Sequence, residues 1–183
     1  MSKSTSFEEG FVSGLTELVA REDRAALAAL RRTLGTPAGS QAEAARVVYR
    51  LLPASAPQWR ERDCWLVAGL FALHPQQIAR HADENRHNLA DSLRRLADAE
   101  SVSAEGVERR LIALLNAERE DLEDHLRHAV AQLRGHDVGV DYVELLRDLR
   151  GWGADERWVQ RRWARAFWGQ TAQPQPATEG EVA

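Results

Sequence analysis

The chain has 183 residues and a formal net charge of −4 at pH 7, with 44% hydrophobic and 28% charged residues, which is typical of a water-soluble globular protein long enough to bury a core. No run approaches the roughly 18 apolar residues of a membrane span, so we expect no membrane-spanning helix. The polar, acidic N-terminus is no signal peptide, and the single cysteine, Cys64, cannot form an intramolecular disulfide, which favours a reducing cytoplasm.

Every strong periodic pattern in the sequence is helical. Apolar residues at three- and four-residue steps predict a first helix over 7–20. Asp23 is a plausible N-cap for a second helix, which is expected to run to Gly35. Residues 36–39 are expected to form a loop.

The next two predicted helices differ in character. Ser40 and Glu43 form a capping-box pattern ahead of an amphipathic helix that Pro53 stops. The helix that starts near Gln58 has a charged first turn followed by an almost wholly apolar segment, and it ends at His74. Because it is apolar on nearly all sides, we expect it to be central and buried.

The second half of the chain contains the longest helical pattern. Residues 76–87 are polar and poorly periodic, so an irregular connection is expected before a short helix at 88–99. Ser103 then caps a long apolar stripe that ends at Gly135. One helix, or two with a break near 116–119, would both fit this stripe.

The remaining signals complete an all-α fold. Asp141 and Glu144 form a second capping-box pattern, and a last helix is expected over 155–168. We predict a compact bundle of about seven or eight helices in a single domain over 7–169, followed by a disordered tail over 170–183.

Candidate catalytic groups are few. Cys64 could be a nucleophile, but its place at the start of an apolar helix favours a structural thiol. His125 and His128 lie one turn apart with acids nearby, which resembles metal-ligand spacing, but the sequence lacks the pair of Glu-x-x-His units on two helices that carboxylate-bridged sites use. Solvated histidines therefore explain the pair better than a metalloenzyme does. With no glycine-rich phosphate loop and no acid–base constellation, we expect neither an enzyme nor a bound metal or cofactor.

Arginine is the unusual feature of the composition, since Lys3 is the only lysine among 24 basic residues. A GC-rich genome would explain the bias, so placement matters more than number. Three clusters are poorly balanced by acids. These are Arg24, Arg31 and Arg32, then Arg109 and Arg110, and finally Arg157, Arg161 and Arg165.

The last cluster is expected to form one line along the last helix, at i, i+4 and i+8, with Arg162 on the same side and Trp163 facing the core. Elsewhere, pairing with Glu123 along the helix is a sufficient explanation for Arg119 and Arg127. One guanidinium group can donate two parallel hydrogen bonds to a phosphate and can stack on a base. The clusters therefore indicate either nucleic-acid binding or a docking face for an acidic protein.

Three stretches in order, DCWLVAGLFALHP, VERRLIALLNAEREDLEDHLRHAVAQLRG and VDYVELLRDLRGWG, resemble the small subunit of type I-E CRISPR surveillance complexes, the CasB family. The resemblance covers about residues 8–169. It departs at Ala90, where a glycine is expected, and over 76–88, which matches poorly.

The resemblance implies an all-helical, non-catalytic subunit, two copies of which lie side by side in an assembly with other subunits around a guide RNA. It implies that the subunit braces the guide–target heteroduplex and holds the displaced DNA strand. The arginines implied are Arg31, Arg32, Arg60, Arg109, Arg110 and Arg127. A protein-only helical adaptor, whose basic faces dock acidic partners, is the alternative.

Overall fold

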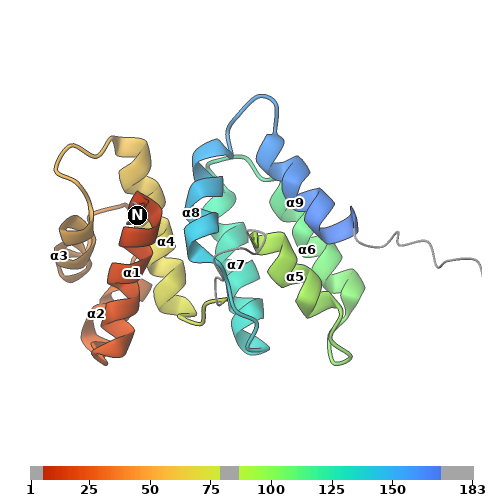
Figure 1. Ribbon diagram of the computed structural model, residues 1–183, viewed down its shortest axis with the longest axis horizontal. Coiled ribbons are helices and arrows are strands. Elements are labelled where there is room, and N and C mark those ends of the chain that lie inside the picture. The colour runs from red at the N-terminus through yellow and green to blue at the C-terminus, as the bar shows by residue number, and fades with distance from the viewer. Residues whose placement is uncertain (1–5, 79–86, 170–183) are drawn as a thin grey trace, which may run out of the picture.

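Nine α-helices make up most of the computed structural model within the residues that it describes, which are 6–78 and 87–169 (Figure 1). In chain order they are α1 (Phe7–Ala20), α2 (Arg24–Arg31), α3 (Ala42–Leu51), α4 (Gln58–Leu73), α5 (Leu89–Ala97), α6 (Ala104–Asn116), α7 (Leu122–Gly135), α8 (Tyr142–Gly151) and α9 (Trp158–Trp168). The all-α prediction is confirmed, with slightly more helices than expected. No helix in the described ranges is long and apolar enough to cross a membrane. The tail predicted over 170–183 lies outside the described residues.

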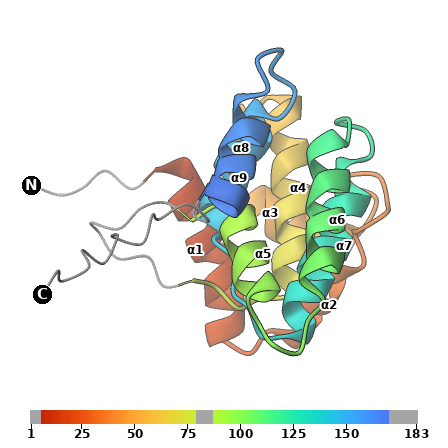
Figure 2. The same cartoon turned by 90° about the vertical axis from the view of Figure 1, so that its right-hand side faces the viewer.

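Helix α4 is the central element, as its apolar sequence predicts. Nine of its 16 residues are buried, and it packs against α2, α3, α7 and α8. Figure 2 shows α4 in the middle, with α1, α8 and α9 on one side and α2, α6 and α7 on the other. The buried Tyr142 of α8 fixes the end of α4, because its hydroxyl donates to the carbonyls of Leu70, at 3.2 Å, and His74, at 2.6 Å.

The long pattern after Ser103 forms two helices. Helix α6 ends at Asn116, where Ala117 turns to an extended backbone, and α7 starts after Asp121. Both helices keep their apolar stripes buried, including Leu111 and Leu126. After the break the chain reverses direction and α7 packs against α6. Both helices therefore turn their apolar stripes toward the same core.

Three predicted N-caps are confirmed. The side chains of Asp23, Ser103 and Asp141 accept hydrogen bonds from backbone N–H groups three residues later, at 2.9, 3.2 and 2.9 Å. The capping box predicted at Ser40 and Glu43 is wrong. Gln41 occupies the N-cap of α3 and makes no side-chain capping bond.

Two helix boundaries also differ from the prediction. Helix α2 ends at Arg31, before Gly35, because Thr33 turns back and donates its hydroxyl to the Leu30 carbonyl at 2.7 Å. Helix α9 begins at Trp158, three residues later than expected, because Arg157 has a left-handed backbone, with φ 49° and ψ 39°, that cannot continue a helix.

The connection after α4 carries the one β-bridge found within the described ranges. Gln77 pairs with Val140 in parallel, with backbone bonds of 3.1 and 3.3 Å on either side. A Cβ at Gly139 would approach the Gln77 backbone to 3.0 Å, so a larger residue would require the two segments to move slightly apart. The rest of the irregular connection, 79–86, lies outside the described residues.

The close approach of α8 and α9 depends on Gly151. A Cβ built there would overlap the indole ring of Trp158, with its Cε2 atom 2.6 Å away. We expect Gly151→Ala to lower the free energy of unfolding by about 1–3 kcal/mol, because the rigid ring or the helix must shift. Urea unfolding followed by tryptophan fluorescence measures the change.

Gly10→Ala is the matched control for this substitution. Gly10 lies on the exposed face of α1, and nothing is within 4 Å of an added Cβ. We expect this substitution to raise the free energy of unfolding by about 0.5–1 kcal/mol through helix propensity alone. If both substitutions changed the free energy of unfolding in the same direction, the packing argument would be contradicted.

Candidate nucleic-acid interface

The first and second arginine clusters meet across α7. The Gly35 amide, just after α2, donates to Glu123 of α7 at 2.5 Å, and an added Cβ at Gly35 would lie 3.6 Å from a guanidinium nitrogen of Arg127. This contact brings the end of α2, with Arg31 and Arg32, next to Arg127. The predicted pairing of Arg127 with Glu123 is wrong, because Glu123 bonds the Gly35 amide and Arg127 pairs with Asp124 at 3.4 Å instead.

Helix α6 lies on the other side of α7. Arg110 joins the two helices, because its Nε donates to Gln132 at 2.7 Å. Arg109 points to solvent and pairs with Glu105 at 3.0 Å, and both side chains are more than 70% exposed. An ion pair this exposed contributes little and exchanges readily for a phosphate.

Helix α9 runs antiparallel to α6. Arg157 binds the carbonyl of Leu115 at the end of α6, and the indole of Trp168 donates to Glu108 near its start, at 2.9 Å. Arg161 and Arg165 are exposed on α9, and their side chains have no partner within the described ranges. Contacts of Gly35, Arg110 and Arg157 thus link the segment after α2 to α7, α7 to α6, and α6 to α9.

Two predicted residues stand apart from the rest. Arg24 opens α2 on its exposed face, about 10 Å along the helix from Arg31. Arg60 lies at the opposite end of α4 from the carbonyl that Arg31 contacts. Its guanidinium stacks 4.9 Å from the ring centre of Phe7 and 5.1 Å from that of Trp59.

Some predicted arginines bind the protein's own backbone. Arg31 donates from Nε to the Ala72 carbonyl in the last turn of α4, at 3.2 Å. Arg157 donates in the same way to the Leu115 carbonyl in the last turn of α6. Because these partners lie 41 and 42 residues away in the sequence, helical spacing gives no signal of them. Sequence reasoning also missed Gln132, whose contact with Arg110 spans two helices.

Comparisons with known proteins identify the family. Residues 26–168 match the family model of the CRISPR-associated protein Cse2. The chain belongs to the Cse2 (CasB) family. It is 36% identical over 146 residues to a CRISPR-associated protein Cse2 of Thermus thermophilus, and the match covers 79% of each chain.

Solved structures of the family agree with this assignment. A crystal structure of CasB from Thermus thermophilus matches with a TM-score of 0.72 and 35% identity, over 88% of this chain and 97% of that one. A chain of a solved CRISPR RNA-guided surveillance complex matches with a TM-score of 0.67 and 32% identity, over 88% and 89%. The family that the three sequence stretches resemble is thus confirmed.

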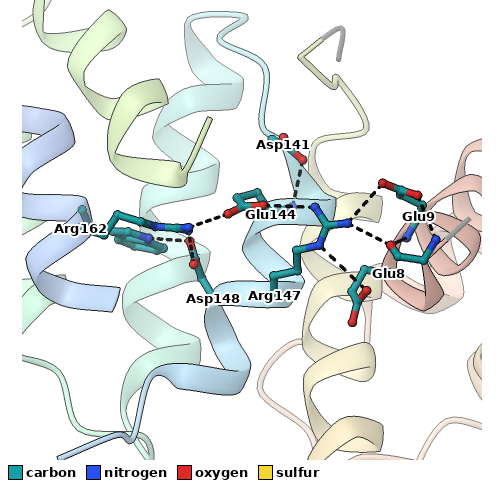
Figure 3. A network of polar contacts seen from close by, with 9 residues as sticks. Glu8, Glu9, Asp141, Glu144, Arg147, Asp148 and Arg162 are labelled. Atoms are coloured by element: carbon teal, nitrogen blue, oxygen red, sulfur yellow. Dashed lines mark hydrogen bonds and ion pairs between the residues drawn. The ribbon is translucent and has the colours of Figure 1, made fainter. Parts of the chain in front are cut away.

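Arg162 does not lie with the surface arginines of the chain, contrary to the prediction. It binds two carboxylates of α8 that are almost fully buried, Glu144 at 2.7 Å and Asp148 in a short contact (Figure 3). Trp163 also donates to Asp148, at 2.7 Å. Arg147 continues the network from Glu144 to α1, where it contacts Ser6, Glu8 and Glu9.

Arg119 is likewise turned inward, and its predicted pairing with Glu123 is wrong. It lies in the loop between α6 and α7, where it binds Asp63 of α4 and donates to the Leu149 carbonyl of α8 at 3.1 Å. Asp63 and Asp148 are both almost fully buried, so these arginines neutralise charge in the interior.

The groups weighed as catalytic candidates lie in ordinary structural settings. Cys64 is fully buried, and burial raises the pKa of its thiol to about 12, so it is protonated. His128 is exposed and His125 is half-buried on α7. In the described part of the chain, no group of three or more His, Cys, Asp or Glu side chains is arranged to hold a metal ion.

Because Arg31 and Arg157 bind backbone carbonyls, we expect their substitution to lower the free energy of unfolding more than substitution of the neighbouring Arg32 and Arg161. We expect Arg31→Ala and Arg157→Ala each to lower the free energy of unfolding by about 1–3 kcal/mol, because a helix-terminal carbonyl loses a charged donor. The neighbouring surface residues give matched controls, and Arg32→Ala and Arg161→Ala should stay within about 0.5 kcal/mol of the parent. Equal effects in the two sets, measured by urea unfolding, would contradict the structural assignment.

Asp148 predicts a pH dependence of stability. Burial raises its pKa to about 6, and Arg162 and Trp163 offset only part of this effect. Because the folded value lies above the unfolded one, the stabilisation is complete below about pH 4 and is lost as the pH rises through 6. From pH 4 to 7 we expect the parent to lose roughly 2 kcal/mol relative to Asp148→Asn.

The measurement is the free energy of urea unfolding of both proteins across this pH range. Asp155→Asn serves as the control, because Asp155 is exposed in the connection between α8 and α9 and should not alter the pH dependence. A parent and an Asp148→Asn variant with parallel pH profiles would rule out titration of this carboxyl.

Proposed function

We propose that this chain is the small, non-catalytic subunit of a type I-E CRISPR RNA-guided surveillance complex in antiviral defence. The observation that carries the proposal is its similarity to a chain of such a complex along nearly its whole described length. In this role it binds nucleic acid through its surface arginines and stabilises the guide RNA–target heteroduplex and the displaced DNA strand.

The arrangement of arginines supports this role. The segment after α2 contacts α7, and α7 contacts α6, which contacts α9; on these elements Arg32, Arg109, Arg161 and Arg165 are exposed and Arg127 is half-buried. In RNA-guided complexes base pairing reads the sequence, so the protein needs only contacts to the backbone. Guanidinium groups provide such contacts to any strand through charge, paired hydrogen bonds and stacking.

Binding of the displaced strand acts on the exchange of a DNA duplex for an RNA–DNA heteroduplex, which is nearly balanced in free energy. The heteroduplex that forms is about as stable as the DNA duplex that it replaces, so modest protein–backbone contacts shift the equilibrium toward the open loop. Two copies side by side would align two arginine surfaces on the same strand. Linked contacts of this kind raise the overall affinity above that of either surface alone.

The dependence of binding on salt tests the proposal. If about four phosphates of a single-stranded oligonucleotide are neutralised, log affinity should fall with log salt at a slope near −3. Arg109→Ala combined with Arg127→Ala should reduce the slope to about −1.5, because two phosphate contacts are lost. Fluorescence anisotropy of a labelled oligo-dT with the full chain measures both slopes.

Arg46→Ala combined with Arg50→Ala is the matched control. These two exposed arginines of α3 lie outside the α2–α7–α6–α9 surface, so the slope should stay near the parental value. The proposal fails if the parent does not bind at low salt, or if the control flattens the slope as much as the test variant does.

A further inference from the structure

A groove of about 950 Å³ lies between α1, α2 and α3, at the end of the molecule away from α9 (Figure 1). Its half-buried lining is small and aliphatic, with Gly14 and Leu18 on α1, Ala28 on α2, and Val47 and Leu51 on α3. Helices α1 and α3 form the two walls of the groove, and α2 forms its base. The two walls touch where Gly14 of α1 meets Leu51 of α3, because a Cβ on Gly14 would overlap the Leu51 side chain.

Exposed arginines surround this apolar lining. Arg46 and Arg50 are one turn apart on α3, and Arg32 lies at the end of α2. The side chains of these three arginines have no hydrogen-bond or ion-pair partner between residues 6 and 78 or 87 and 169. A fourth arginine, Arg21, pairs with Glu17 at 2.9 Å.

Acids near the groove do not neutralise the three arginines. Three acidic residues line it together with the four arginines. Glu17 is held by Arg21, Asp23 caps α2 through the Ala26 amide at 2.9 Å, and Glu43 is exposed in the first turn of α3. The groove therefore combines an aliphatic floor with three arginines, on α3 and at the end of α2, that have no ion-pair partner among the described residues.

This combination fits an acidic amphipathic helix better than a nucleic acid. Single strands gain affinity by stacking bases on aromatic side chains, and the groove lining includes no aromatic residue among those that the structure describes. Aliphatic floors instead accept the leucine or alanine face of a helix, as in other helix-in-groove complexes. The arginines on the rims complement carboxylates on the flanks of such a helix.

We propose that the α1–α2–α3 groove docks an amphipathic helix of a partner protein, with an apolar face on the groove floor and acidic residues opposite Arg46, Arg50 and Arg32. The site adjoins the nucleic-acid surface proposed above at Arg32, but the proposal does not depend on that surface. Docking would complete a small bundle in which the incoming helix packs between α1 and α3 and covers Leu18 and Val47.

The test uses a synthetic helical peptide with Leu and Ala on one face and Glu on both flanks, and a second peptide with Lys in place of Glu. We expect the full chain to bind the Glu peptide saturably and the Lys peptide at least roughly tenfold more weakly. Methyl resonances of Leu18, Val47 and Leu51 should shift on binding, whereas that of Ile112, exposed on α6, should not.

Charge reversal gives the decisive comparison. Arg46→Glu combined with Arg50→Glu should weaken the Glu peptide at least roughly tenfold and strengthen the Lys peptide. Arg161→Glu combined with Arg165→Glu is the matched control, because it reverses two exposed arginines at the same spacing on α9 and should leave both peptides unaffected.

Three results would overturn the docking proposal. The first is no saturable binding of the Glu peptide, and the second is equal weakening by the two charge reversals. The third is a loss of oligo-dT binding in the Arg46/Arg50 variant that exceeds its loss of peptide binding, which would make the groove a nucleic-acid channel. If the α9 reversal alone abolished oligo-dT binding while the peptide results held, both proposals would stand independently.

Discussion

The helices are held in place by guanidinium groups that bind the last-turn carbonyls of other elements. Every helix leaves carbonyls without partners at its C-terminus, where the helix dipole also favours a cation. Among the described residues, arginines from other elements satisfy the ends of four helices. The contacts join Arg31 to Ala72, Arg157 to Leu115, Arg119 to Leu149 and Arg94 to Phe167. Each contact sets the position of one helix end relative to a second element.

This interaction divides the arginines into two groups that look alike in the sequence. One group, with Arg119 and Arg162, is bound to buried carboxylates and carbonyls, and the other, with Arg109 and Arg161, is exposed. The fork of a guanidinium binds a backbone carbonyl and a carboxylate at once, which an ammonium group does less well. An excess of arginine is therefore partly a structural requirement of the fold, and only the exposed group is available to a partner.

Local patterns predict the helices well and the side-chain contacts poorly, for a physical reason. The caps at Asp23 and Asp141 and the buried face of α4 depend on residues a few positions apart, so the sequence shows them. The bonds of Arg162 to Asp148 and of Arg119 to Asp63 span 14 and 56 residues, and tertiary packing decides them. For the same reason, the predicted start of α9 is wrong, because the left-handed Arg157 reaches back to α6.

The buried network leaves the net charge of the surface almost unchanged. Asp63, Glu144 and Asp148 lie in the interior, where Arg119, Arg147 and Arg162 balance them, so acids and arginines are withdrawn in equal number. What a partner meets therefore depends on where the remaining acids and arginines lie on the surface, which the formal charge of −4 does not give. Besides Arg62, Arg95, Arg134 and Arg150, exposed arginines lie on α2, α6 and α9 and around the groove beside α3. Of the arginines assigned to the proposed strand surface, only Arg32 also lines the groove, so a strand and an acidic helix would compete for that guanidinium group alone.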